Sequence, residues 1–230
     1  MTWPMVWKEW REQRWKLLFG TAMLCFFTAA FLVAQQASDK ELAVVIWILG
    51  GLILALYSAM GVFAPERTNG TAGFLAAKPV RPEAVFLIKW LFGWLNVAGP
   101  MAASLLLALA IVEKTPGVGL GRFFAAGLGM ATMFYTLTCC LAPRRAGEAM
   151  VGLVGLLVFV GSLMYIYTFT FTALDTRMEW FVVRTLFFVC PFSWPVLTVQ
   201  EHTEHGVHLV VVQAVVLGSA LWIGMGKWKK

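Results

Sequence analysis

Charged residues are scarce in this sequence. Lys, Arg, Asp and Glu make up 13% of its 230 residues, whereas apolar residues make up 60%. A soluble domain usually carries about 25% charged and about 45–50% apolar residues. So few charged side chains cannot cover the surface of the chain in water, which argues against a soluble protein. The apolar excess predicts an all-α integral membrane protein whose surplus apolar surface faces lipid.

The signatures of common catalytic sites are also missing. The sequence has no G-x-x-x-x-G-K-[ST] phosphate loop, so we expect no ATP site of the usual kind on this chain. An intramembrane protease would need a histidine within an apolar run, and none is present. A CDP-alcohol transferase would need clustered aspartates, whereas Asp39 and Asp175 stand alone. We therefore expect a protein that is not an enzyme.

The cysteines have no metal-binding or redox spacing. The four residues are Cys25, Cys139, Cys140 and Cys190, and none forms a C-x-x-C pair. Three of them fall in or beside apolar runs, where cysteine commonly serves as a small packing residue. We interpret them as structural.

Long charge-free runs divide the chain into six segments. Each matches the ~20 residues that a helix needs to cross the hydrocarbon core. They predict six transmembrane helices in a single domain over residues 1–230, at 17–38, 42–65, 90–112, 123–143, 149–174 and 208–226. A further segment, 181–200, holds Pro191 and Pro195, which disfavour a straight spanning helix. We predict a re-entrant hairpin there, on the outer side of the membrane.

The distribution of Lys and Arg predicts the orientation. With six crossings and an inner N-terminus, thirteen basic residues fall on the inner side and five on the outer side. This bias obeys the positive-inside rule, whereas a seventh crossing through 181–200 would place the C-terminal lysines outside. We therefore expect a multi-pass protein of the cell (plasma or inner) membrane with both termini in the cytoplasm.

Residues 1–16 have the pattern of an amphipathic helix. At helical spacing, Trp3, Trp7 and Trp10 share one face, whereas Glu9 and Arg11 belong to the opposite, charged face. Such a helix lies in the membrane interface with its apolar face toward the lipid. We predict an interfacial helix on the inner side, after which the chain turns into the first span. A simple basic flank of that span is the alternative.

The longest hydrophilic stretch, residues 66–89, follows the second span on the predicted cytoplasmic side. Its core around Phe74 and Leu75 favours a short helix, which Thr71 can cap and Pro79 ends. An exposed Phe-Leu pair suits neither water nor lipid, so the segment predicts a protein partner. The alternative is an ordinary basic loop that only orients the chain.

These motifs together resemble those of ABC type-2 transporter permeases, a family of transmembrane subunits. The similarity in the loop comprises Glu66-Arg67, Gly70-Thr71, Phe74-Leu75, Pro79-Val80 and Lys89. The similarity at the N-terminus comprises Trp7-Lys8-Glu9-Trp10-Arg11-Glu12, in the place of the family's interfacial helix. The layout of six spans with an outer re-entrant segment before the last one is similar as well.

The resemblance implies a partner and a division of labour. In the family, the loop forms a coupling helix that docks on a separate ABC ATPase (nucleotide-binding) subunit. The docking residues implied here are Glu66, Arg67, Gly70, Thr71, Phe74, Leu75, Lys78 and Pro79. The resemblance also implies that two permease chains, identical or different, form the substrate pathway in the bilayer. ATP and Mg would bind to the ATPase, and this chain would bind no cofactor or nucleic acid.

The spans say little about the substrate. No charged residue falls in the middle of a predicted span, which disfavours an ion or proton pathway. Polar residues in the spans are weak candidates, since Thr and Ser commonly bond the backbone or a neighbouring helix. They are Thr21, Thr28, Asn96, Thr132, Thr136, Thr138, Thr168, Thr170 and Thr172. We expect export of a hydrophobic or amphipathic substrate.

Two other functions also fit the layout. A haem-exporter-B-like subunit of cytochrome c maturation has a similar length, and Gly99-Pro100 in the third span is a mild point of similarity to it. A non-transport membrane scaffold would need no coupling helix. Charged substitutions of Phe74 and Leu75 would therefore distinguish a scaffold from a permease.

All three histidines of the chain lie just before or at the first residue of the last predicted span. His202, His205 and His208 recur at about one helical turn and could hold zinc or copper. A polar loop at the membrane surface is the interpretation we favour, partly because Gly206 would loosen a helix here.

Overall fold

The computed structural model describes residues 3–34, 40–68, 81–111, 120–142, 147–173, 181–193 and 203–229. The predicted all-α fold is confirmed for these residues, which form helices and no strand. The helices are α1 (Trp3–Ala34), α2 (Lys40–Thr68), α4 (Pro82–Ile111), α5 (Leu120–Leu141), α6 (Glu148–Ala173), α7 (Phe181–Val189), the 3-10 helix η2 (Pro191–Ser193) and α9 (Thr203–Lys229).

Three helices of the described chain are long and apolar enough to cross a membrane. These stretches are Pro82–Ala110 in α4, Glu148–Tyr165 in α6 and Gly206–Lys227 in α9. They correspond to the third, fifth and sixth predicted spans. Shorter apolar stretches occupy Trp47–Val62 in α2 and Ala125–Leu141 in α5. The other three crossings stay a prediction.

Three helices extend well beyond the predicted spans at the N-terminal side. The helix α9 begins at Thr203 instead of residue 208, so the prediction of a polar loop around Gly206 was wrong for residues 203–208. The helix α1 is continuous from Trp3 to Ala34, so no break in the helix separates the predicted interfacial segment from the first predicted span. The helix α4 begins at Pro82 instead of residue 90. Pro82 fits the first turn of a helix because its missing N–H needs no partner there, and Glu83 complements the helix dipole. Lys89 therefore lies in α4, and the prediction that it belongs to the loop was wrong.

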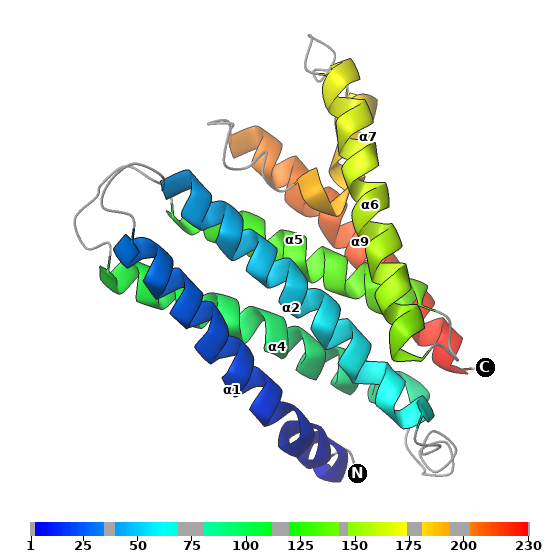
Figure 1. The fold of residues 1–230 in the computed structure, drawn as a ribbon. Helices are drawn as coiled ribbons and strands as arrows, with labels where there is room; N and C mark the ends of the chain where they lie inside the picture. The colour runs from blue at the N-terminus through cyan, green and yellow to red at the C-terminus, as the bar shows by residue number, and fades with distance from the viewer. Residues whose placement is uncertain are drawn as a thin grey trace.

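Successive long helices run in opposite directions (Figure 1). The helices α1, α4 and α6 begin at the end of the molecule where both termini lie, and α2, α5 and α9 finish there. We call this the terminal end. The helix α1 packs along α4, and α2 packs against both α4 and α5. The centre of the bundle is therefore formed by α2, α4 and α5.

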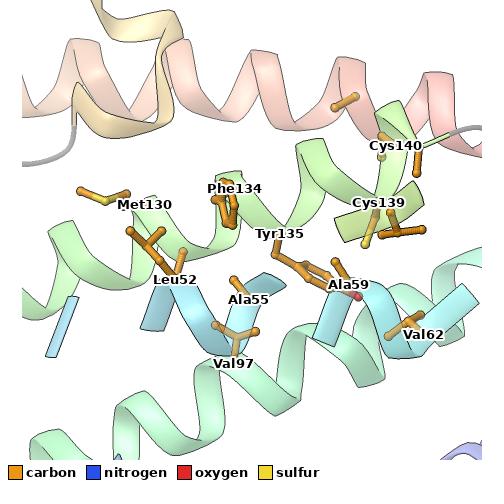
Figure 2. Close-up of a cluster of buried hydrophobic side chains, with 14 of the residues drawn as sticks. Leu52, Ala55, Ala59, Val62, Val97, Met130, Phe134, Tyr135, Cys139 and Cys140 are labelled. Carbon is orange, nitrogen blue, oxygen red and sulfur yellow. The ribbon is translucent and has the colours of Figure 1, made fainter. Parts of the chain in front are cut away.

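The hydrophobic core fills the space between these three helices (Figure 2). Ala55 and Ala59 of α2 and Val97 of α4 are buried together with Phe134 and Tyr135 of α5. Alanines four residues apart lie on one face of α2, and their small size lets the neighbouring backbones approach.

The helices α2 and α5 approach α4 closely at Gly93. Its carbonyl oxygen accepts a hydrogen bond of 2.6 Å from Ser58 Oγ of α2. A Cβ atom at Gly93 would lie 2.9 Å from Cζ of Tyr135, too close for ordinary packing. Glycine is required here because side chains of α2 (Val62) and α5 (Tyr135) leave no space for a Cβ atom on this turn of α4.

The helix α7 is too short to cross the hydrocarbon core, since its nine residues fall well below the ~20 that are needed. The chain leaves α7 after Val189 and forms the 3-10 turn that starts at Pro191. Phe187 and Phe188 of α7 pack against Leu209 and Val212 of α9. The part of the predicted re-entrant segment from 194 to 200 lies outside the described residues.

Candidate functional site

A buried ion pair joins α1 to α4. The Lys89 ammonium donates a hydrogen bond of 2.7 Å to Glu9 Oε1, and these side chains are only 2% and 1% exposed. Removing two charges from water costs several kcal/mol per ion unless they are closely paired. A charge pair buried between two helices is retained only where its geometry is close and specific, so this pair is the starting point of the candidate site.

A second polar contact lies further along the same helix interface. Asn96 Nδ2 donates a hydrogen bond of 2.9 Å to Gln13 Oε1, and both side chains are buried. Gln13 follows Glu9 by four residues and Asn96 follows Lys89 by seven, so each helix presents its two polar residues on one face. We call these four residues the polar ladder. Its order requires α1 and α4 to run in parallel, as they do in Figure 1.

Beyond the polar ladder, the interface between α1 and α4 is apolar and tight. A Cβ atom at Gly99 would lie 2.9 Å from Leu17 Cδ1, and one at Gly20 would lie 3.5 Å from Pro100 Cγ. Among the described residues, the polar side-chain contacts between α1 and α4 thus lie near the terminal end, where both helices begin (Figure 1).

The polar ladder fixes the register of the two helices. Each rung pairs a donor on α4 with an acceptor on α1. Sliding one helix along the other would leave buried polar groups unpaired, and each unpaired group costs about 1–3 kcal/mol, or more if it is charged. The apolar contacts beyond the ladder tolerate such a shift more easily. The ladder therefore couples any movement of α4 to α1.

Glu9 does not lie where the sequence placed it. The amphipathic pattern predicted Glu9 on the charged face of an interfacial helix, together with Arg11. The structure buries Glu9 against α4 and leaves Arg11 exposed, so this part of the prediction was wrong. The four-residue spacing of Glu9 and Gln13 was visible in the sequence, but their partners on α4 were not.

The three predicted interfacial tryptophans share an uncovered surface of α1. Trp3, Trp7 and Trp10 are 74%, 57% and 41% exposed. Their common accessible face agrees with the amphipathic pattern. Whether this face lies in a membrane interface stays a prediction.

The predicted docking residues fall mostly outside the described residues. Glu66 and Arg67 belong to the last turn of α2. The docking residues outside the described chain are Gly70, Thr71, Phe74, Leu75, Lys78 and Pro79. The end of α2 and the start of α4, which flank this segment, both lie at the terminal end (Figure 1).

Four of the candidate pathway threonines form hydrogen bonds within their own helices. Hydroxyls donate to the carbonyl oxygen four residues earlier at 2.7–2.8 Å in Thr21, Thr28, Thr136 and Thr138. Thr132 accepts a hydrogen bond of 2.9 Å from Trp94 Nε1. The interpretation that these hydroxyls form hydrogen bonds with the helix backbone or with a neighbouring helix is therefore confirmed for these five threonines. The side chains of Thr168, Thr170 and Thr172 lie outside the described residues.

His208 packs against α7. Its Nε2 atom lies 3.0 Å from Thr185 Oγ1, and its ring stacks on Phe181 with centroids 4.9 Å apart. His202 and the side chain of His205 lie outside the described residues. Within the described chain, no three His, Cys, Asp or Glu residues gather as a metal site would require.

Gln213 of α9 holds the end of α7, a role that sequence reasoning missed. Its amide Nε2 donates to the carbonyl oxygens of Phe188 and Cys190, the latter at 2.9 Å, and lies 3.3 Å from Ser193 Oγ. The last carbonyls of a helix have no partner within the helix. The available signal was an amide side chain within the apolar run of α9, and its contacts explain how α7 and η2 are anchored.

No protein-family model, curated protein or solved structure matches this chain.

Proposed function

We propose that this chain is the transmembrane permease subunit of an ABC-type transporter. In this proposal the chain crosses the cell membrane six times with both termini in the cytoplasm. Two permease chains form the substrate pathway, and a separate ATPase subunit binds ATP and Mg. The transported substrate is hydrophobic or amphipathic and is exported.

The observation that carries the proposal is the position of the polar ladder beside the predicted docking segment. The helix α4 begins at Pro82, directly after the segment that holds Phe74 and Leu75. Two turns later, Lys89 is joined to Glu9 of α1 by the buried ion pair. A displacement of the docking segment would thus move α4 and α1 together. Transporters need such a rigid connection to convert ATP-driven movement into a change between two states.

The charges at the terminal end support the proposed orientation. The described basic residues there include Arg11, Arg14, Arg81 and Lys227. Lys40 and Arg122 belong to the opposite ends of α2 and α5, and Arg184 belongs to α7. Lys227 Nζ also donates a hydrogen bond of 2.6 Å to the Cys140 carbonyl oxygen in the last turn of α5. A basic end is expected on the cytoplasmic side of a membrane protein.

The proposal is tested by capture of the partner. The affinity-tagged chain is purified in mild detergent from membranes of its source organism, and co-purifying proteins are identified by mass spectrometry. We expect an ATPase with a phosphate loop to co-purify. Leu75→Asp should abolish this capture, because a charged side chain cannot occupy an apolar docking pocket without a partner.

Val182→Asp provides the matched control. Val182 is 64% exposed at the opposite end of the molecule, so the same chemical change there should leave capture intact. Failure of the wild type to capture an ATPase would contradict the proposal. Equal capture by wild type and Leu75→Asp, at equal amounts in the membrane, would instead favour a scaffold.

A further inference from the structure

The beginning of α1 extends beyond what a bilayer core requires. At about 1.5 Å per residue, its 32 residues measure about 48 Å, against a hydrocarbon core of about 30 Å. All charged residues of α1 lie between Lys8 and Lys16, and none follows in the helix. The excess length therefore belongs to the first four turns, which must lie at the level of the lipid headgroups.

An exposed stripe of aromatic residues on these turns includes an arginine. Trp3, Trp7, Trp10 and Arg14 follow one another at intervals of four, three and four residues, so they lie on one helix face. All four are exposed. The guanidinium of Arg14 also lies 5.5 Å from the ring centroid of Trp15, which is 67% exposed. Tryptophan is the residue that proteins favour at headgroup level.

The same turns expose more positive than negative charge. The carboxylate of Glu9 is buried against Lys89 and contributes nothing to the surface. The carboxylate of Glu12 lies 3.6 Å from the Lys8 ammonium. In the described chain, both carboxylates of α1 are thus engaged by lysines, and Arg11 and Arg14 are left facing outward.

We propose that this surface, composed of Trp3, Trp7, Trp10, Arg11, Arg14 and Trp15, binds anionic phospholipids. Arg11 follows Trp7 by four residues, so it borders the tryptophan stripe, and its prediction on the opposite face was wrong. The two guanidinium groups bind lipid phosphate, which matches their planar pairs of donors. The indole rings lie among the glycerol and upper acyl groups, and their stripe sets the depth of the helix. The proposal requires that the chain is embedded in a membrane but does not depend on the transport function.

The test measures lipid retention by the purified full-length chain. The protein in detergent is titrated with phosphatidylglycerol or phosphatidylcholine, and bound lipid is counted by native mass spectrometry. We expect phosphatidylglycerol to be retained preferentially. Each basic residue near an anionic surface contributes about fivefold in affinity, so the double variant R11Q/R14Q should lose about 25-fold for phosphatidylglycerol. Its affinity for phosphatidylcholine should not change.

The double variant K8Q/E12Q is the control, because it alters two residues of the same turns without changing the net charge. It should retain phosphatidylglycerol as the wild type does. Equal retention of both lipids by the wild type, or equal losses in both double variants, would overturn the proposal. Loss of ATPase capture in R11Q/R14Q with unchanged lipid retention would assign the surface to a protein partner and overturn it too.

The lipid measurement contains neither ATPase nor ATP. Its failure therefore leaves the permease proposal intact, and a failure of ATPase capture leaves the lipid result intact.

Discussion

Glu9 and Lys89 form a buried ion pair with an Oε1–Nζ distance of 2.7 Å, although 80 residues separate them in the sequence. The pair belongs to an interface in which Gln13 and Asn96 make the next polar contact. A buried ion pair adds little net stability compared with a well-packed apolar pair, but loss of one partner leaves the other charge buried and unpaired. The pair therefore makes the alignment of α1 and α4 specific.

Glu9→Gln should strongly destabilise the protein. The substitution removes the carboxylate that the buried Lys89 ammonium contacts at 2.7 Å, and loss of one member of a buried ion pair typically costs about 3–5 kcal/mol. The control Glu12→Gln breaks the exposed contact with Lys8 and should change stability by less than about 1 kcal/mol. Both free energies of unfolding can be measured by denaturant titration of the purified protein in detergent.

The double variant E9L/K89M should be more stable than Glu9→Gln alone. Replacement of both charges by apolar side chains removes the desolvation cost along with the attraction. If E9Q and E12Q were equally mild, or if E9L/K89M were the least stable of the three, the pair would not be buried as the structure describes.

Gly93→Ala should destabilise the core between α2, α4 and α5. The added methyl group would lie 2.9 Å from Tyr135 Cζ, and overpacking of this kind costs about 1–3 kcal/mol. Gly161 of α6 is the matched control, since a Cβ there meets nothing within 4 Å. Gly161→Ala should be neutral or stabilise the helix by up to about 1 kcal/mol. The melting temperature should therefore fall in Gly93→Ala and stay unchanged or rise in Gly161→Ala. An equal fall in both variants would contradict this packing.

The all-α fold class and the positions of the three longest apolar helices could be predicted from the sequence, because both depend on local composition. A charge-free run of sufficient length is visible without knowledge of the fold, and α4, α6 and α9 bear this out. The start of α4 was misplaced because Pro82, Glu83 and Lys89 were interpreted as parts of a hydrophilic loop. Pro82 and Glu83 in fact begin the helix.

The candidate site was beyond the reach of sequence patterns because it depends on contacts between distant residues. In the sequence, Glu9 fits the polar face of an amphipathic helix. Its burial depends on Lys89, which lies on another helix. Gln213 poses the same problem, because its acceptors belong to a segment about 20 residues earlier in the chain. Local periodicity identifies faces of helices but does not identify which helix covers them.

Cys190 should react slowly with alkylating reagents in the folded protein. Burial raises the pKa of its thiol, an effect only partly offset by hydrogen bonds with the Phe192 backbone and with Ser162. A raised pKa means that less of the reactive thiolate is present between neutral and mildly alkaline pH. Iodoacetamide labelling of the Cys190 peptide, followed by mass spectrometry, should be much slower than labelling of free glutathione. Denaturant should remove the difference, and equally fast labelling of the folded protein would contradict the burial of this thiol.

Gln213→Leu should release the end of α7 without unfolding the bundle. The amide of Gln213 donates to the carbonyl oxygens of Phe188 and Cys190, and leucine would remove both hydrogen bonds. Cys190 would keep its hydrogen bonds from Ser193, so the cost of about 1–3 kcal/mol arises mainly at the buried Phe188 carbonyl. Hydrogen–deuterium exchange should therefore accelerate in residues 181–193 while α2, α4 and α5 keep their protection. Ala214→Leu, an exposed neighbour on α9, should leave exchange in 181–193 unchanged. Because the loss is local, uniform acceleration across the chain would show that Gln213 supports the whole bundle instead of anchoring α7 and η2.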